Sequence, residues 1–195
     1  MSPSLGNSKR QDDPVSGILT FIIADLCVFA LLFAGFMDER SRQVSVFNDS
    51  AATLNLHLGV LNTLILVSSG LCVVFAVSAA RQAKRELVRR WLVAGFIIGL
   101  GFGVTKIIEY NAKFEHGINM LTNDFYMFYF ALTGAHYLHF LGGMAALAFV
   151  WFQTTRQPID SVFYNRIEAV GLYWHMVDLL WILIFPLLYI VGVKL

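Results

Sequence analysis

The sequence is divided into uninterrupted apolar blocks, several of which reach about 20 residues, and this pattern leaves very few possible folds. A helix of that length rises about 30 Å, which is the thickness of a bilayer's hydrocarbon core. Backbone polar groups in lipid must be bonded internally, and continuous apolar blocks do not fit the alternating strands of a barrel. We therefore predict five transmembrane helices, over residues 17–37, 58–80, 91–110, 125–152 and 169–193.

These spans take up most of the 195 residues, so the predicted fold class is all-α. A polar N-terminal tail is expected over residues 1–16, and a five-helix transmembrane bundle over residues 17–195. The connections are short, so consecutive helices are expected to be antiparallel neighbours. The longest predicted loop, residues 38–57, follows the first span.

The distribution of basic residues predicts the orientation. One set of connections carries most of them: Lys9, Arg10, Arg81, Lys84, Arg85, Arg89, Arg90, Arg156 and Arg166. The opposite side has only Arg40, Arg42, Lys113 and Lys194. Because cytoplasmic loops are enriched in Lys and Arg, the N-terminus is predicted inside and the C-terminus outside. The net charge of +1 gives no reason to expect a nucleic-acid partner.

Acidic residues and histidines interrupt the apolar spans at six positions: Asp25, Glu109, His136, His139, His175 and Asp178. A charged side chain at the centre of a bilayer costs roughly 2.5–3.5 kcal/mol even on the most lenient scale. Such residues therefore face a protein interior, a partner or a water-filled path, and they are the candidate functional residues of this chain.

Asp25 has no Lys or Arg within helical reach. It is interpreted either as a neutral acid in a helix–helix hydrogen bond or as a group that exchanges protons. His136 and His139 are spaced i, i+3 and share one helix face, where buried hydrogen bonding, to Asp25 among others, is the favoured interpretation. His175 and Asp178 have the same spacing, so a direct bond between them is expected.

Glu109 follows Lys106 by one helical turn near the end of the third span. The favoured interpretation is an ion pair at the membrane interface, with the long Lys106 side chain snorkelling toward water.

The third span also carries Gly95, Gly99 and Gly103, and such a ridge of small residues lets another helix approach closely. Packing within the chain is favoured over docking of a partner. Proline at position 186 is expected to kink the last helix.

Metal and haem ligation are disfavoured by spacing. Two haems stacked across a bilayer require histidines about 13–14 residues apart on one helix, and an i, i+3 pair does not supply them. The chain offers no recurring cluster of metal ligands. Two rival functions stay open: a b-type haem electron carrier, because of the intramembrane histidines, and a proton-coupled transporter, because of Asp25 and Glu109.

Several motifs occur in order along the predicted helices: Asp25, Asn62-Thr63 with Ser68-Ser69, Glu109-Tyr110, Thr133-Gly134-x-His136-x-x-His139, and Tyr173-Trp174-His175-x-x-Asp178-x-x-Trp181. With them the chain resembles subunit III of the haem-copper oxidases over nearly its whole length beyond the tail. Five helices match the short form, found in bacterial quinol oxidases and in the accessory protein of nitric oxide reductase. Residues 181–189 resemble the nitric-oxide-reductase-associated branch.

The resemblance implies a function without a catalytic centre in this chain. A subunit III carries no haem or copper, packs on the catalytic subunit I-like protein that holds them, binds lipid, and supports proton uptake and stable turnover. It also implies a multi-pass protein of a bacterial inner membrane, in aerobic respiration or denitrification. Asp25 then matches the family's buried, carbodiimide-reactive glutamate, and His136 and His139 match its histidine pair. Lys106 stands where the family often has Gln, and Tyr137 where it often has Gly.

Overall fold

Five long helices build the structure, a computed structural model that describes residues 14–156 and 158–190. They are α1 (Pro14–Arg42), α3 (Leu56–Arg81), α4 (Arg85–Glu115), α5 (Asp124–Arg156) and α6 (Ser161–Phe185). All five are long and apolar enough to cross a membrane, which confirms the predicted all-α class with five spans. Residues 1–13 of the predicted tail and 191–193 of the last predicted span lie outside the described residues.

Local capping explains where two of these helices begin. The Asn55 side chain accepts a hydrogen bond from the Leu58 amide at the start of α3, and Asp160 does the same for Phe163 at the start of α6. These caps satisfy amides that have no partner in the first helical turn. The helices therefore extend beyond the apolar blocks into the polar ends of the bundle.

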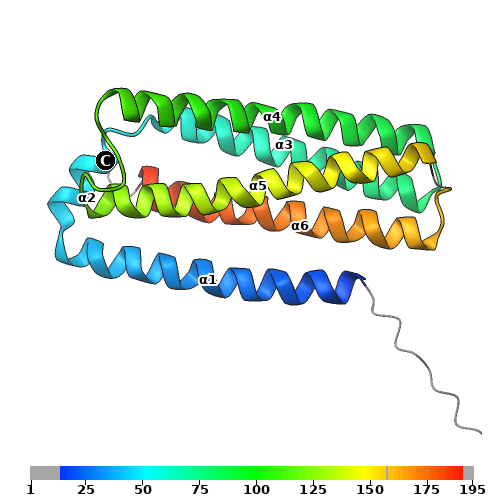
Figure 1. The fold of residues 1–195 in the computed structure, drawn as a ribbon, viewed down its shortest axis with the longest axis horizontal. Helices are drawn as coiled ribbons and strands as arrows, with labels where there is room; N and C mark the ends of the chain where they lie inside the picture. The colour runs from blue at the N-terminus through cyan, green and yellow to red at the C-terminus, as the bar shows by residue number, and fades with distance from the viewer. Residues whose placement is uncertain (1–13, 157, 191–195) are drawn as a thin grey trace, which may run out of the picture.

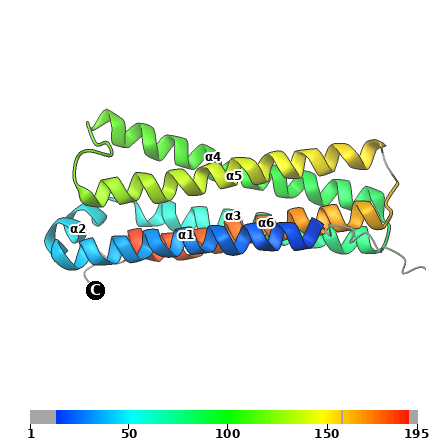
Figure 2. The ribbon, with the colours of Figure 1, turned by 60° about the horizontal axis from the view of Figure 1, so that its bottom comes forward.

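The helices lie lengthwise beside one another, with α1 along one side of the group formed by α3–α6 (Figures 1 and 2). Three consecutive pairs, α3–α4, α4–α5 and α5–α6, are neighbours as predicted. The first pair departs from that prediction, because α1 packs against α6 and α5.

A short helix, α2 (Val44–Ala51), occupies much of the segment predicted as a long loop. Phe47 is buried at 1% exposure, and its ring lies 5.1 Å from that of Phe36 and 5.7 Å from that of Phe125. The prediction of a loop was wrong here because this contact stabilises a helix that the local sequence does not mark. The same contact joins α1 to α5, so α1 need not lie beside α3.

The last helix changes form at Pro186. The α-helical hydrogen-bonding pattern ends at Phe185, and a π-helix, η1 (Pro186–Ile190), continues the chain. Proline has no amide hydrogen and clashes with the carbonyl four residues earlier, and a wider turn relieves both problems. The π-turn leaves Leu188 and Tyr189 buried in the bundle.

The predicted glycine ridge of α4 faces neighbouring helices of this chain. A Cβ at Gly95 would lie 3.3 Å from the Ser69 carbonyl, one at Gly99 would lie 3.2 Å from Trp174, and one at Gly103 would lie 3.2 Å from Phe140. The close approach of α3 to α4 is also marked by a hydrogen bond of 2.7 Å from the Ser69 hydroxyl to the Gly95 carbonyl. These contacts agree with the interpretation of the ridge as an internal packing face.

Candidate functional site

Asp25 and His139 meet between α1 and α5. Asp25 Oδ1 lies 3.0 Å from His139 Nε2, and the two side chains are 13% and 19% exposed. The ring of Phe29 packs 5.7 Å from the imidazole, and the Tyr173 hydroxyl donates to the His139 carbonyl at 3.2 Å. The lone acid of the first helix therefore finds its polar partner on another helix, in largely apolar surroundings.

The other ring nitrogen of His139 limits where the proton of this contact can lie. His139 Nδ1 is 2.8 Å from the Ala135 carbonyl, which only accepts hydrogen bonds, so Nδ1 carries a hydrogen. The contact between Nε2 and Asp25 then shares a single proton, held either by a neutral carboxylic acid or by an imidazolium facing a carboxylate. The geometry suits a group that takes up and releases one proton, and equally a static hydrogen bond.

His136 is tied to a different helix. Its side chain is fully buried, and Nε2 donates to the Val177 carbonyl of α6 at 2.9 Å. The ring packs between Phe102 and Trp181, with both ring centroids 5.4 Å away. His136 therefore joins α5 to α6 and does not contact the acid of α1.

Lys106 and Glu109 form the expected ion pair, but in an unexpected place. Lys106 Nζ lies 2.9 Å from Glu109 Oε2, and the side chains are only 1% and 6% exposed. The prediction that Lys106 snorkels toward the interface was therefore wrong. Its ammonium instead lies among aromatic rings, 5.2 Å from the centroids of both Tyr129 and Trp181, where cation–π attraction compensates part of its lost hydration.

Two tyrosines that the sequence reasoning did not identify complete this cluster. The Tyr129 hydroxyl donates to Glu109 Oε1 at 2.9 Å, and the Tyr189 hydroxyl donates to the same oxygen at 2.5 Å. Tyr189 also accepts from Lys106 Nζ at 3.3 Å. Glu109 thus receives three donors from α4, α5 and η1, and the cluster fastens η1 to the bundle.

His175 and Asp178 lie together on α6, where α6 packs against α3. His175 Nδ1 is 3.5 Å from Asp178 Oδ2, and the side chains are 44% and 9% exposed. Asp178 occupies space left by Gly70 of α3, because a Cβ there would overlap its carboxylate. The expected pairing of these two residues is present, and it is separate from the contact between Asp25 and His139.

The six candidate residues thus take part in three ion-pair or hydrogen-bond contacts, one of them with Lys106, and in two histidine–backbone bonds, between or along helices. Among the described residues, no group of three His, Cys, Asp or Glu side chains is arranged to hold a metal ion. The fold and these contacts define a class: a polytopic helical membrane protein whose intramembrane ionisable side chains pair with one another or with backbone.

The family follows from sequence comparison. The family model for cytochrome c oxidase subunit III matches residues 10–193, so the chain belongs to that family, and the resemblance to subunit III of the haem-copper oxidases is confirmed. The function that this resemblance implied, that of a non-catalytic subunit III of a haem-copper oxidase, is also confirmed.

Similar proteins come from several bacteria. A probable cytochrome c oxidase subunit 3 of Mycobacterium tuberculosis is 29% identical over 175 residues, which cover 90% of this chain and 86% of the relative. The cytochrome c oxidase subunit 3 of Corynebacterium diphtheriae is 29% identical over 177 residues, with the same coverage. The cytochrome bo(3) ubiquinol oxidase subunit 3 of Pseudomonas putida is 28% identical over 179 residues, covering 92% of this chain and 86% of the relative.

Proposed function

We propose that this chain packs in the membrane against a catalytic subunit I-like protein that holds the haem and the copper or iron, and that it helps to sustain proton uptake there. The contact of Asp25 with His139, at 3.0 Å, supports the proposed role in proton uptake, because either side chain can hold the proton between them. The supporting observation for the first part is membership of the subunit III family. Under this proposal the chain itself binds no haem or metal, and lipid is its only expected ligand.

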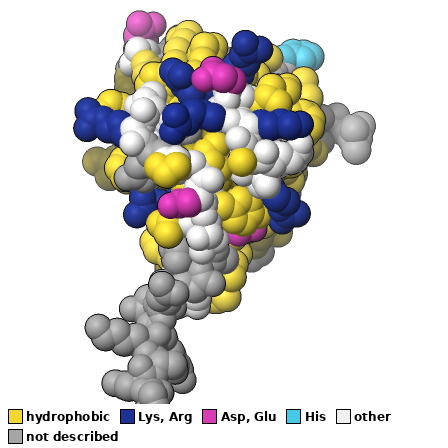
Figure 3. All heavy atoms as spheres, turned by 90° about the vertical axis from the view of Figure 1, so that its right-hand side faces the viewer, with side chains coloured by type: hydrophobic (Ala, Val, Ile, Leu, Met, Phe, Trp, Pro, Cys, Tyr) yellow, Lys and Arg dark blue, Asp and Glu magenta, His cyan; other side chains and the backbone are white. Residues whose placement is uncertain are grey.

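The proposed orientation places the N-terminal end in the cytoplasm of a bacterial cell. Figure 3 faces the end of the bundle from which α1 starts and at which the α3–α4 connection lies, and Lys and Arg side chains gather on it. Arg89 lies 5.8 Å from the ring of Trp151, a pairing typical of a membrane interface. The positive-inside rule assigns this end to the cytoplasmic face of the inner membrane.

The catalytic partner is proposed to be a terminal oxidase of aerobic respiration or a nitric oxide reductase of denitrification. Residues 181–189 carry the resemblance to the nitric-oxide-reductase-associated branch. The similar proteins named above are all subunits of oxidases. Oxygen and nitric oxide consumption by the purified complex distinguishes the two partners directly.

Purification tests the association. The tagged chain is isolated in mild detergent from membranes that contain its complex, and the co-purifying chains are identified by mass spectrometry and by their haem absorbance. We expect a haem-bearing partner in stoichiometric amount. Isolation of this chain alone contradicts the proposal, and a Soret band that belongs to this chain by itself favours the b-type electron carrier instead.

Two substitutions of Asp25 test the role of the proton. Asp25→Asn keeps a hydrogen-bond donor for His139 Nε2 but cannot exchange a proton, whereas Asp25→Leu removes both properties. If the pair supports proton uptake, both variants lower turnover of the complex or shorten its active lifetime to a similar extent. If the contact is only structural, Asp25→Asn behaves as the wild type and Asp25→Leu alone is destabilised, by about 1–3 kcal/mol.

A further inference from the structure

Of the six candidate residues, His175 is the one that lies on the outer surface of the bundle. His175 is 44% exposed, whereas Asp25 and His139 are below 20% and His136, Glu109 and Asp178 are buried. His175 is midway along the 30-residue segment Ser161–Ile190, about 20 Å from either end at 1.5 Å per residue. Its imidazole is therefore presented at the depth of the acyl chains.

The pair that His175 forms with Asp178 is incomplete. Only Nδ1 is near a polar partner, and among the described residues no hydrogen bond is formed by the imidazole Nε2. An exposed imidazole nitrogen without a hydrogen-bond partner is unfavourable at this depth, which indicates that something outside the bundle covers it.

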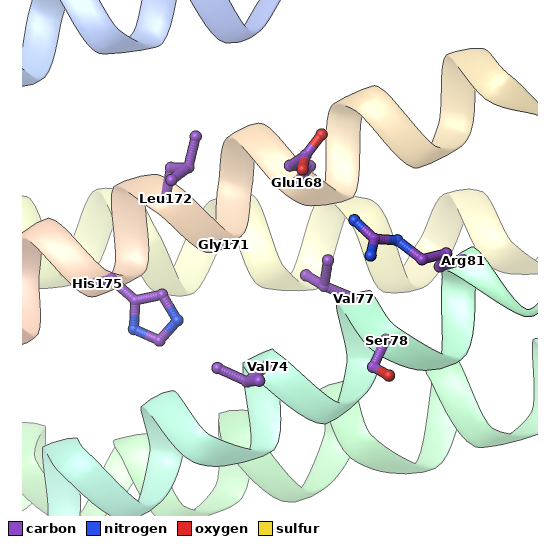
Figure 4. A pocket seen from close by; sticks show the side chains of 8 residues that line it. All are labelled: Val74, Val77, Ser78, Arg81, Glu168, Gly171, Leu172 and His175. Carbon is purple, nitrogen blue, oxygen red and sulfur yellow. The ribbon is translucent and has the colours of Figure 1, made fainter.

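The surface beside His175 is hollow. A groove of about 290 Å³ runs between α3 and α6, with His175 and Val74 at one end and Arg81 and Glu168 at the other (Figure 4). The groove is otherwise lined by small or aliphatic residues: Val77, Ser78, Gly171 and Leu172. Small residues along such a groove let the ridge of another helix approach closely.

The chemistry at the deep end of the groove distinguishes a lipid from a protein as occupant. An acyl chain fills apolar space but offers no hydrogen-bond partner, so lipid would leave the imidazole unsatisfied. A transmembrane helix fills the same space and also supplies a polar side chain at the required depth. Arg81 and Glu168, at the membrane-interface end, present both signs of charge and so match the polar end of a helix.

We propose that the α3–α6 face, comprising Leu71, Val74, Ser78, Gly171, Leu172, His175 and Leu179, is the surface on which a transmembrane helix of the catalytic subunit docks. That helix carries a hydrogen-bonding side chain opposite His175. This inference rests on the proposed association with a catalytic subunit and adds the face through which it occurs.

Photocrosslinking in the intact complex tests the face. A benzophenone amino acid replaces Leu71 or Leu179, which are 53% and 46% exposed on the α3–α6 face. Matched controls replace Ile97 of α4 or Leu138 of α5, which are 62% and 69% exposed near the middle of their helices. After irradiation of native membranes, we expect adducts with the catalytic subunit from Leu71 and Leu179 and not from the controls.

Every other pattern overturns the proposal. Adducts only from the control positions, or lipid adducts alone from Leu71 and Leu179, show that this face does not dock the catalytic subunit. Adducts from both sets show that contact with the catalytic subunit is not confined to this face, which overturns its assignment as the docking surface. Co-purification of the unsubstituted complex is measured in parallel. If no haem-bearing chain co-purifies, the proposed function itself has failed; if one does and Leu71 and Leu179 give no protein adduct, only the assignment of the face has failed.

A second measurement separates docking from folding. His175→Leu removes the polar group, and His175→Gln keeps a hydrogen-bonding side chain. One lost interhelical hydrogen bond makes the catalytic subunit dissociate roughly three- to thirty-fold more readily in the Leu variant, while the Gln variant retains most of the association. Equal retention in wild type and both variants overturns the role of His175.

Discussion

Replacing Glu109 by Gln is expected to destabilise this protein strongly, because it leaves a buried cation without its counter-charge. The substitution preserves the volume of the side chain and one carbonyl acceptor. It removes the negative charge 2.9 Å from Lys106 Nζ, whose side chain is only 1% exposed. Breaking a buried ion pair from one side typically costs about 3–5 kcal/mol.

Two further variants, Lys106→Met and the double variant, identify why Glu109→Gln lowers the stability. Lys106→Met removes the cation but leaves Glu109 with two tyrosine donors, at 2.9 and 2.5 Å. Its expected cost is therefore lower, about 1–3 kcal/mol. In the double variant no charge is left unpaired, so we expect it to be more stable than Glu109→Gln alone, which is the reverse of additive behaviour.

Cysteine accessibility gives the assay. Cys72 is buried in α3 at 7% exposure, and Cys27 is exposed and is replaced by Ser in the background protein. Labelling of Cys72 by a fluorogenic maleimide during a thermal ramp then follows unfolding. At about 2–4 °C per kcal/mol for a chain of this size, Glu109→Gln lowers the midpoint by roughly 6–20 °C.

An exposed ion pair supplies the control. Arg42 and Asp38 lie 2.9 Å apart but are 66% and 62% exposed, so Asp38→Asn is expected to cost less than about 1 kcal/mol. The reasoning is refuted if Glu109→Gln costs no more than this control, or if the costs of the two single substitutions simply add in the double variant.

Two further predictions concern close packing and the end of the chain. Gly70→Ala should destabilise the protein by about 1–3 kcal/mol, because its Cβ would overlap a carboxylate of α6, whereas Gly134→Ala, whose nearest neighbouring atom is 3.9 Å away, should be neutral or stabilising in the same Cys72 assay. Tyr189→Phe removes the hydroxyl that donates to Glu109 at 2.5 Å and should cost about 1.5–3 kcal/mol. Increased protease cleavage after the last helix would report the resulting release of η1, and unchanged cleavage and stability would contradict the role assigned to this bond.

The five helices were predictable because apolar blocks long enough to cross a membrane are compatible with few structures other than transmembrane helices. Backbone satisfaction in lipid and the length of each block together lead to five spans, and i, i+3 spacing is enough to pair His175 with Asp178. The sequence narrowed the partner of Asp25 to a polar group on another helix, with His136 and His139 among the candidates. The choice of His139 depended on how α1 packs against α5.

Burial of Lys106 could not be read from its position in the sequence. A lysine near the end of an apolar block usually extends toward water, and periodicity does not show that neighbouring helices close over it. Four aromatic rings around the ammonium come from α4, α5, α6 and η1, so the site exists only after the bundle has assembled. Tyr189 was missed for a related reason, because the π-turn after Pro186 changes the face on which later residues lie.

His136 and His139 of α5 make different contacts although their i, i+3 spacing suggests that they share one helix face. At 100° per residue, positions three apart differ by about 60° around the helix axis and by about 4.5 Å along it. This is enough for His136 to reach the Val177 carbonyl of α6 while His139 reaches Asp25 of α1. His136 donates its proton to a carbonyl that accepts only, so moving that proton would break a helix–helix bond. His139 meets a group that itself binds a proton, so under the proposed function it is the member of the pair expected to take part in proton exchange.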